Sequence, residues 1–558
     1  MTSKVFTTGT VIDSEWLNDV NNVTYNRTAG VVSVKEYGAV GAGVTDDTAA
    51  VNATLVEAGY IYIPDGTYIV DPLSVASNTT IVMGPNAILK AKAGYGVNDR
   101  LLNIIGVDNV TIIGGTIQMG GAEYVGVANE QRHCVIVSDS TNVNLIRVTA
   151  IDSGGDGFYV GGSLPVTNVL LEDCVASNHY RNGLSITHGT NIRVVRGKYS
   201  NIPSNAEAPA GPWAGIDVEP NSGGFVTNVV IDGPEIHTTG GDGVLSSGPS
   251  ASLITDLIVR NCYIHDVGGY GIKPSYTDGH IIVDNRIEDC VLSGIEDTTT
   301  TALYSVIRNN AIKTCGSYGI KGFVSNSDIS GNTVDTTTNE GIYWSLGQFT
   351  TITCNRVKTT GRNGIYQERA YNGVVADNSV RDSQMHGIHV SGTVTSSITR
   401  SRKVTVSGNT VANASLLTNN TYSGIYLDTY ANTSVVTGNT VVCGTTGNLP
   451  LHAIYAVDTT VYVANNQTDG GCKSGNSQVN VGGVAPASFY NSVSMLGNAY
   501  IRDKLLFSNF CHISAGTGTP EGAVGGPIGS LFLRTDGGAS TTLYVKQSGV
   551  GNTGWVAK

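Results

Sequence analysis

The triplets Tyr318-Gly319-Ile320, Glu340-Gly341-Ile342 and Asn363-Gly364-Ile365 repeat one short phrase at intervals of 22 and 23 residues. The phrase, a glycine followed by a large apolar residue, recurs between Gly157 and Gly424 at intervals of 22 to 37 residues. Self-similarity at such a period is typical of a solenoid, in which each repeat is one turn of a coil stacked on the next. The repeat therefore predicts a stacked coil.

A second phrase, out of step with the first, places an asparagine two residues before Ile or Val in successive repeats. Its asparagines are Asn285, Asn310, Asn332, Asn355, Asn378, Asn409 and Asn439. Stacked side-chain amides can hydrogen-bond from turn to turn while β-branched residues fill the interior. Short Val-, Ile- and Thr-rich runs between Gly, Asn and Asp corners favour strands. The fold class predicted is all-β, a parallel β-helix.

Cysteine usage agrees with a packed coil. The chain has nine cysteines, and Cys290 and Cys315 each lie three residues after an interior isoleucine, so the two should stack in neighbouring turns. No metal-ligand spacing occurs, and buried free thiols are favoured over a disulfide framework. We expect no metal and no cofactor.

Length and charge narrow the class of partner. A solenoid grows by adding coils, so 558 residues predict an elongated body rather than several globules. The net charge of -12 argues against nucleic acid and against an anionic membrane surface as partners. No stretch is apolar enough to span a membrane, and the first residues lack the core of a signal peptide, so ordinary secretion is not expected.

The two ends depart from the coil rhythm. Residues 1–30 contain an amphipathic helix pattern too short to be stable alone, which predicts a partner chain. Residues 31–100 are expected to form an N-terminal cap in which Asp46 and Asp47 begin a helix that plugs the coil. Regular coils are expected over 101–484, and 485–558 reads as a linker and a small β module for trimerisation or recognition.

Three segments resemble a known family. The run Tyr37-Gly38-Ala39, then Thr45-Asp46-Asp47-Thr48, then Ile63-Pro64-Asp65-Gly66-Thr67-Tyr68 resembles the N-terminal cap of the pectate-lyase-like right-handed β-helix family. Within that family the chain looks like a bacteriophage tailspike. The opening Phe6-Thr-Thr-Gly-Thr-Val resembles a phage tail-attachment segment, and the segment Gly529–Trp555 resembles a module that closes many phage tail proteins. This resemblance implies a right-handed coil, a homotrimer on the virion tail, attachment to tail or adaptor proteins through residues 1–30, and depolymerisation of a bacterial surface polysaccharide.

One column of side chains is a candidate for polysaccharide contact. By strand alternation, the second residue after each repeated glycine should face outward. This outer column consists of Tyr159, Ser185, Asp217, Leu245, Lys273, Glu296, Lys321, Tyr343, Tyr366, His389, Tyr426 and Tyr455. Aromatic faces can stack on sugar rings, so Tyr343, Tyr366 and His389 are predicted to bind substrate. Tyrosines that decorate a β surface or pack on another subunit remain the alternative.

The carboxylates of that column suggest chemistry. Asp217 and Glu219 share a strand face with Cα atoms roughly 6.6 Å apart, and the long segment before them ends at Trp213. Adjacent coils add His179 and Arg181 before the pair and Asp242 after it. We predict Glu219 and Asp217 as an acid and base pair with Asp242 as alternate partner, Arg181 orienting the sugar, and His179 and Trp213 binding it. Glu296 with Asp297, and Glu340 with Glu368, are rival sets.

The predicted reaction is endo-glycosidic hydrolysis, with inverting stereochemistry favoured and retaining left open. Polysaccharide lyase chemistry is the alternative within enzymes, with Lys273, His179 and Arg181 as candidate residues. A non-catalytic adhesin that uses the same aromatic stripe is the alternative outside them. No Gly-x-Ser-x-Gly elbow supports an esterase.

Overall fold

The computed structural model describes residues 30–558 apart from residues 58, 95–98, 121–130, 203–210, 249–252, 299–303, 393–402, 445–446, 459, 470–478, 482–503, 508–510 and 550. The chain divides into two units, residues 1–488 and 489–558. The helix expected within residues 1–30 lies outside the described residues.

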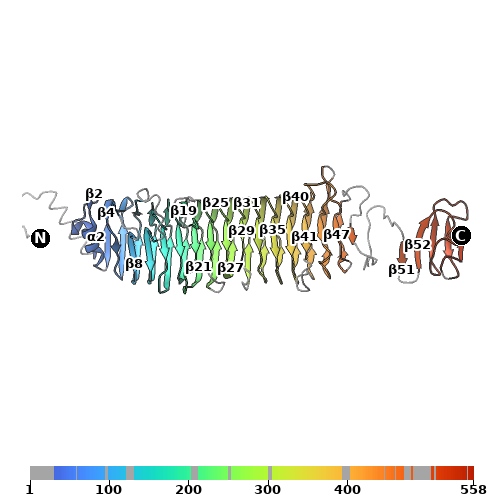
Figure 1. Ribbon diagram of the computed structural model, residues 1–558, viewed down its shortest axis with the longest axis horizontal. Helices are drawn as coiled ribbons and strands as arrows, with labels where there is room; N and C mark the ends of the chain where they lie inside the picture. Colours follow the sequence, from blue (N-terminus) through green and yellow to red (C-terminus); the bar gives the residue numbers. More distant parts are fainter. Residues whose placement is uncertain are drawn as a thin grey trace, which may run out of the picture. The chain divides into compact units, whose positions relative to one another are not determined.

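The first unit is a parallel β-helix whose coils each pass through three sheets, here named A, B and C (Figure 1). Sheet A contains 17 described strands, all parallel, in which each strand pairs with its counterpart one coil further along. They are β1 Val31–Ser33, β3 Tyr60–Ile63, β6 Thr79–Met83, β9 Asp108–Ile113, β12 Thr141–Ile146, β15 Val166–Glu172, β18 Gly189–Val195, β21 Val226–Asp232, β24 Ile254–Arg260, β27 Thr277–Val283, β30 Ser305–Arg308, β33 Asp328–Ser330, β36 Thr351–Thr353, β39 Val374–Ala376, β42 Thr405–Ser407, β45 Val435–Thr437 and β48 Tyr462–Ala464.

Sheet B follows sheet A in every coil and also has 17 described strands. They are β2 Ala42–Asp46, β4 Gly66–Val70, β7 Ala87–Ala91, β10 Thr116–Gln118, β13 Thr149–Ile151, β16 Val175–Ser177, β19 Lys198–Ile202, β22 Glu235–Thr239, β25 Tyr263–Val267, β28 Arg286–Cys290, β31 Ala311–Cys315, β34 Thr333–Thr337, β37 Arg356–Thr360, β40 Ser379–Ser383, β43 Thr410–Ala412, β46 Thr440–Val442 and β49 Gln467–Thr468.

Sheet C contains the repeated Gly-Ile phrase and has 16 described strands. They are β5 Leu73–Ser74, β8 Leu102–Ile105, β11 Val135–Ser138, β14 Phe158–Val160, β17 Leu184–Ile186, β20 Ile216–Val218, β23 Val244–Ser246, β26 Ile272–Pro274, β29 Ile295–Glu296, β32 Ile320–Gly322, β35 Ile342–Ser345, β38 Ile365–Glu368, β41 Ile388–Ser391, β44 Ile425–Leu427, β47 Ile454–Ala456 and β50 Val479–Val481. The parallel pairing of Ile320 with Ile342, and of Ile342 with Ile365, confirms the coil predicted from the phrase.

The two repeated phrases have separate structural reasons. A Cβ on Gly294 would lie 2.4 Å from Ile312 Cγ2 and 2.9 Å from the carbonyl oxygen of Gly319, so only glycine allows the coils to approach here. The asparagine ladder is confirmed: Asn355 Nδ2 donates to Asn378 Oδ1 at 3.0 Å and to the carbonyl of Ile329 at 2.8 Å. The same amide pattern runs from Asn285 to Asn466. These bonds satisfy buried backbone groups at the turn between sheets A and B.

Most of the described thiols are buried and free, as the sequence predicts, whereas Cys354 is exposed and Cys511 is partly buried. Cys290 and Cys315 are buried, unbonded and paired in register between β28 and β31. Among the described residues, no group of three His, Cys, Asp or Glu side chains is arranged to hold a metal ion.

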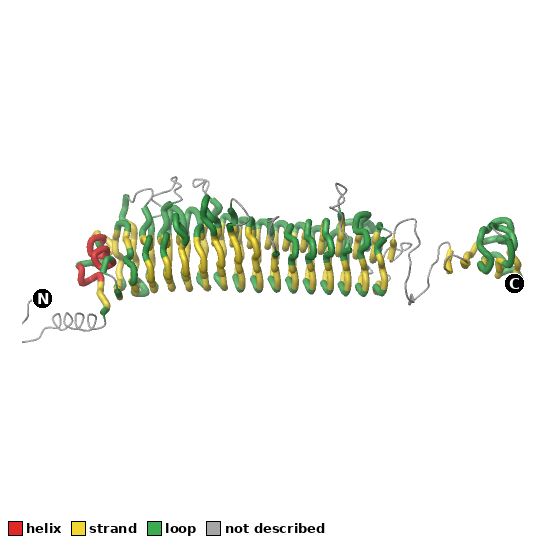
Figure 2. Tube along the Cα trace, turned by 90° about the horizontal axis from the view of Figure 1, so that it is seen from below, coloured by secondary structure: helices red, strands yellow, loops and turns green. Residues whose placement is uncertain are grey.

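A helix covers the first coil. Helix α2, Thr48–Leu55, follows the 3-10 turn η1, Val34–Tyr37, and buries Val51 and Leu55 against the coil (Figure 2). Asp46 accepts a hydrogen bond from Thr48 N–H at 3.1 Å, as a capping residue does. Asp47 instead accepts from the N–H groups of Val40 and Gly41, so it holds the preceding turn rather than the helix. Coil pairing already includes β3 and β4, which lie within the segment expected to be cap.

The second unit is a small sheet of β51 Lys504–Phe507, β52 Cys511–Gly516, β53 Leu531–Arg534, β54 Leu543–Lys546 and β55 Trp555–Ala557. Its buried core consists of Phe532, Tyr544 and Trp555. None of the helices in the described part of the chain is long and apolar enough to cross a membrane.

Candidate functional site

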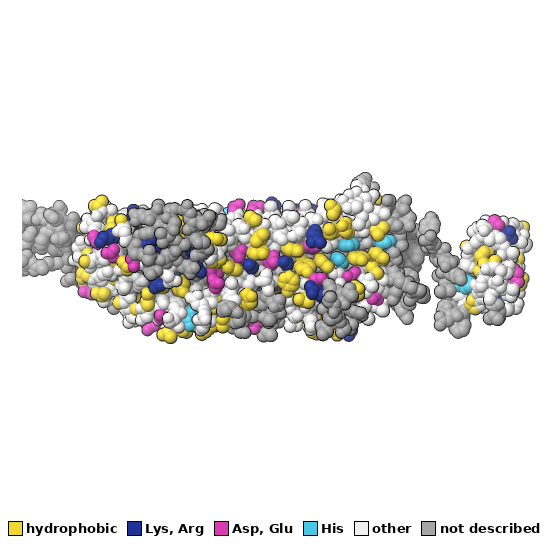
Figure 3. All heavy atoms as spheres, in the orientation of Figure 1, with side chains coloured by type: hydrophobic (Ala, Val, Ile, Leu, Met, Phe, Trp, Pro, Cys, Tyr) yellow, Lys and Arg dark blue, Asp and Glu magenta, His cyan; other side chains and the backbone are white. Residues whose placement is uncertain are grey.

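The later half of the outer column in sheet C is an unbroken stack of rings. We name Tyr343, Tyr366, His389, Tyr426 and Tyr455 the aromatic column. The rings of Tyr366 and His389 are stacked with centroids 4.4 Å apart, and the centroids of neighbouring pairs lie 5.0 to 5.6 Å apart. All five side chains are half-buried, so one face or edge of each meets solvent. Figure 3 shows hydrophobic and histidine side chains gathered over the coils of β35 to β47.

Two carboxylates lie within this stack. Glu368 accepts hydrogen bonds from Tyr343 Oη at 2.6 Å and from Ser345 Oγ at 2.8 Å. Burial raises its pKa, but these hydrogen bonds outweigh burial and lower the pKa overall. Burial raises the pKa of Asp428 to about 6, although the backbone N–H groups of Tyr430 and Gly392 oppose the shift. Glu368 was only a rival in the sequence, and Asp428 was missed because it lies outside the repeated phrase.

The earlier half of the column is charged and more deeply buried. The carboxylate cluster is defined as Asp217 with the three acids whose charges act on it, Asp156, Glu219 and Asp242, and Arg181 contacts Asp156 and Glu219. Arg181 Nη1 lies 3.1 and 3.3 Å from the two carboxylate oxygens of Asp156, and Arg181 Nη2 lies 3.8 Å from Glu219 Oε2. The Arg181 side chain is 15% exposed and that of Glu219 is 40% exposed. The structure therefore brings Arg181 and Glu219 together at the surface, as the sequence predicted.

Asp156 is the buried anchor of that arrangement. It accepts a hydrogen bond from Asn182 N–H at 3.0 Å, and His133 Nδ1 lies 3.4 Å from its Oδ2. Burial raises the pKa of Asp156 to about 6, while the positive charge of Arg181 opposes the shift. His133, which stacks on Tyr159, was missed by sequence reasoning because it lies outside the repeated phrases.

The expectation that Asp217 faces solvent is wrong. Asp217 is 0% exposed, since it lies in register between the buried Ser185 and Leu245, and Asn182 Nδ2 donates to its Oδ2 at 3.1 Å. Burial and the nearby negative charge of Glu219 raise its pKa well above the ordinary value. Asp217 therefore lies below the surface that a polymer could reach.

Asp242 is the more accessible partner. It is partly exposed and accepts a hydrogen bond from Tyr270 N–H at 2.8 Å. Burial raises its pKa, while the Tyr270 N–H and the charge of Lys273 act in the opposite direction. The ammonium of Lys273 lies 4.8 Å from the ring centre of Tyr270.

His179 is also corrected by its position. It is buried at the corner after β16, where Ser153 Oγ lies 2.7 Å from its Nδ1 and the carbonyl of Ala150 lies 3.1 Å from its Nε2. Burial lowers its pKa to about 4, so His179 is a neutral structural side chain that a dissolved polymer does not reach. Trp213 is partly exposed beside the cluster, and its indole nitrogen has no hydrogen-bond partner among the described residues.

The rival sets are engaged in contacts of their own. Glu296 forms an ion pair with Lys321 at 2.8 Å, and Asp297 is buried against His280 at 2.9 Å. Glu340 is buried and accepts from Asn363 Nδ2 at 3.1 Å.

Comparisons with known proteins agree with the fold. A family described as Right handed beta helix region matches residues 198–357 and 304–402. The preneck appendage protein of Bacillus phage PZA is 27% identical over 198 residues, which covers 31% of this chain and 23% of the relative. The chain thus matches about a quarter of that relative's length. Plasmin and fibronectin-binding protein A of Streptococcus pneumoniae is 27% identical over 170 residues, covering 25% of this chain and 23% of the relative.

Among solved structures, the Dettilon tailspike protein superposes with a TM-score of 0.34 and 15% identity, covering 76% of this chain and 72% of that one. With its coil of three parallel sheets and the family match over residues 198–402, the first unit of this chain is a right-handed parallel β-helix similar in part to phage appendage proteins.

Proposed function

We propose that this chain is a tail-associated appendage of a phage particle that binds a bacterial surface polysaccharide along sheet C and cleaves it by endo-glycosidic hydrolysis. The observation that carries the proposal is the outer column itself. Five half-buried aromatic rings run along consecutive coils, and the same column leads back to the carboxylates around Arg181. Aromatic faces suit the C–H surfaces of sugar rings, and the stacked coils hold them at fixed spacing.

Glu219 and Asp242 act as the reacting carboxyl groups in this proposal. Asp242 has a raised pKa and serves as general acid, donating its proton to the leaving glycosidic oxygen. Glu219, the exposed carboxylate, accepts a proton from the attacking water as general base. Arg181 holds Glu219 in place and orients the sugar. Trp213 packs against the sugar. Asp217 remains below as a buried partner of Asn182.

A chromatographic assay on purified capsule or lipopolysaccharide tests the reaction. We expect shortened products with new reducing ends and no absorbance from unsaturated sugars. Glu219→Gln should lower the rate by about 100-fold or more, the range of general acid–base catalysis. Asp256→Asn, which changes an exposed carboxylate on sheet A, should leave it unchanged. Full activity of Glu219→Gln would contradict the role of Glu219 as general base. Unsaturated products would show that the reaction is a lyase reaction rather than hydrolysis.

A non-catalytic adhesin is the second candidate, and the burial of Asp217 favours it. With Asp217 sealed and Asp156 bound to Arg181, Glu219 and Asp242 are the members of the cluster within reach of a polymer. In that case the polysaccharide binds along the aromatic column and is recovered at its original length. The same chromatographic assay separates the two functions.

The assembly is part of the proposal. We infer a homotrimer attached to tail or adaptor proteins through residues 1–30, which lie mostly outside the described residues. The similarity to a phage preneck appendage protein supports a place on the virion, with action at the host surface. The net charge of -12 supports neither a nucleic-acid partner nor membrane insertion.

A further inference from the structure

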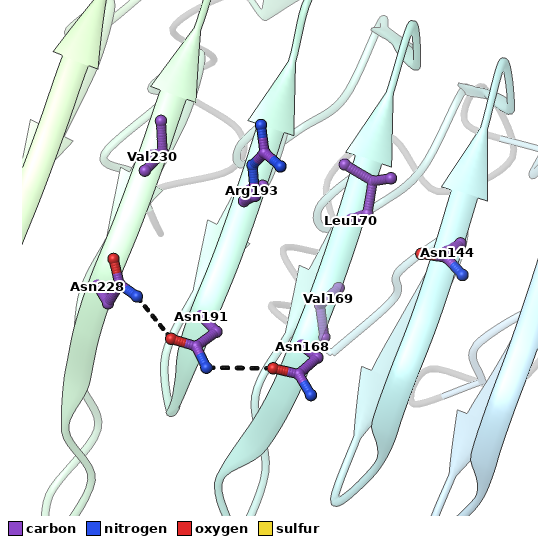
Figure 4. A pocket seen from close by; sticks show the side chains of 8 residues that line it. All are labelled: Asn144, Asn168, Val169, Leu170, Asn191, Arg193, Asn228 and Val230. Carbon is purple, nitrogen blue, oxygen red and sulfur yellow. Dashed lines mark hydrogen bonds between the residues drawn. The ribbon is translucent and has the colours of Figure 1, made fainter.

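Sheet A has a hollow of its own, lined by side chains that the proposed function does not use. Its volume is about 440 Å³, and Figure 4 shows the side chains of four neighbouring strands that line it. The lining residues are Asn144, Asn168, Val169, Leu170, Asn191, Arg193, Asn228 and Val230. The hollow belongs to a different wall of the coil from the aromatic column and the carboxylate cluster, which are on sheet C and its loops.

Arg193 places a positive charge at this hollow. It is exposed and makes no hydrogen bond or ion pair with any described residue. The nearby arginines are already paired: Arg196 with Glu172 and Asp173, and Arg260 with Asp232. Burial raises the pKa of Asp232, but hydrogen bonds from Asn261 and Arg260 lower it overall, and the charge of Arg193 helps to lower it. Asp232 Oδ1 accepts from Asn261 Nδ2 at 2.8 Å and its Oδ2 accepts from Arg260, so Asp232 forms no ion pair with Arg193. The guanidinium of Arg193 is therefore available to a carboxylate from outside the chain.

The walls of the hollow suit a sugar. Leu170, Arg193 and Val230 are in register on adjacent strands, so an aliphatic side chain stands on each side of the cation (Figure 4). Such walls can pack against the C–H face of a ring whose carboxylate meets Arg193.

A ridge of amides borders the hollow. Asn191 Nδ2 donates to Asn168 Oδ1 at 3.1 Å, and Asn228 Nδ2 donates to Asn191 Oδ1 at 2.6 Å. A carboxamide has two N–H donors and two lone pairs, so each middle member keeps one donor and one lone pair for a ligand. The ladder already holds these exposed amides in place, so the entropic cost of ordering them when a ligand binds is small.

We propose that this hollow on sheet A is a second saccharide site, selective for acidic sugars, in which Arg193 binds the sugar carboxylate and the amide ridge binds its hydroxyls. The site is independent of hydrolysis at sheet C.

Titration calorimetry on the full chain tests the site with three acidic probes: tetragalacturonic acid, a hyaluronan tetrasaccharide and a sialic acid trimer. Maltotetraose is the neutral control. We expect at least one acidic probe to bind saturably, with the affinity reduced about tenfold or more by Arg193→Gln, the loss of one charge-assisted contact. Arg356→Gln removes an exposed arginine of sheet B that has no described ion pair, and it should change the affinity less than about twofold.

Three results would overturn the proposal. They are binding of no acidic probe, equal binding of maltotetraose, and unchanged binding in Arg193→Gln. A probe that is lost in Tyr366→Ala but retained in Arg193→Gln would belong to sheet C and would count against the site. Light scattering on Arg193→Gln tests whether a protein chain occupies the hollow instead. A change in the number of associated chains would identify the hollow as a protein interface and would overturn the proposal. Depolymerase activity plays no part in these readouts.

Discussion

At the scale of single residues, Asp156 makes stability depend on pH. Its folded-state pKa of about 6 lies above the ordinary 3.8, so the folded chain binds this proton more tightly than the unfolded chain. The contribution of protonated Asp156 to the free energy of unfolding is present below pH 4 and is lost as pH rises from about 4 to about 6. We predict that Asp156→Asn flattens this part of the pH profile, by roughly 1 to 3 kcal/mol of unfolding free energy. Melting temperatures measured from pH 4 to pH 7 check it.

Asp173 is the matched control with the opposite sign. Hydrogen bonds from Arg196 lower its pKa, so its contribution is present above the ordinary pKa and is lost as pH falls. Asp173→Asn should therefore reduce the loss of stability below about pH 4 and leave the profile between pH 4 and pH 7 parallel to that of the unmodified chain, with a small change because the pair is exposed. A profile for Asp156→Asn that parallels the unmodified chain would contradict the assignment of Asp156.

Strand alternation placed Asp217 and Glu219 near one another, but it could not predict which of them meets solvent. Exposure is decided by Asn182 and Ser185, which come from the coil before and cover Asp217. A contact of this kind depends on the loop path between coils, and no local pattern encodes that path. His179 was misplaced for the same reason, because a corner residue can turn inward or outward.

At the scale of elements, the buried ladder was predictable because its pattern is local and repeated. Each asparagine follows a corner, and Ile or Val stands two places later in every repeat that the sequence revealed. Asn466 continues the ladder but was overlooked, because Thr468 takes the place of the usual Ile or Val.

We predict that Asn355→Ala destabilises the coil by about 2 to 4 kcal/mol, because several buried partners lose their bonds at once. Asn355 Oδ1 accepts from both the N–H and the Nδ2 of Asn332, and its own Nδ2 donates to Ile329 and Asn378. Protease digestion and thermal unfolding measure the effect. Asn86→Ala removes a single exposed side-chain bond to Asp65 and should cost less than about 1 kcal/mol. Equal stability of the two variants would refute the ladder's role.

The aromatic column makes a separate prediction for binding. Tyr366 stacks on His389 and is bonded through its hydroxyl to Ser391 Oγ at 2.7 Å, so its ring is held rigidly. Tyr366→Ala should weaken binding of the cognate polysaccharide about tenfold, as loss of a rigid aromatic contact would. Tyr462→Ala changes an exposed tyrosine of sheet A and serves as the control in the same surface-binding measurement. Equal losses in both variants would mean that the column has no special part in binding.

At the scale of the whole molecule, the repeat length was enough to predict the coil, because every turn must bury the same apolar face against its neighbours. The extent of the coil was harder to predict. Strands β3 and β4 pair into the sheets before any Gly-Ile phrase begins, because pairing needs only alternation and not the glycine. The sequence patterns at the two ends of the chain occur only once, so their structure could be predicted only from a resemblance to known proteins.

The second unit carries the last prediction. Its core side chains Phe532, Tyr544 and Trp555 lie on one face of the sheet, and by alternation the opposite face presents Leu531, Leu533, Leu543, Val545 and Val556. Leu533 is 47% exposed and Val556 is 40% exposed. An aliphatic face on so small a sheet is stabilised when it is buried, and identical faces can pack about a symmetry axis.

We therefore predict that Leu533→Asp reduces the mass of the full chain in solution from three copies to one, because it puts a charge into the shared face. Light scattering coupled to size exclusion measures the mass. Ile528→Asp, at an aliphatic residue that is 61% exposed in the loop before β53, should keep the trimer. A Leu533→Asp protein that retains three copies would exclude this face as the contact and leave the walls of the coil to hold the subunits together.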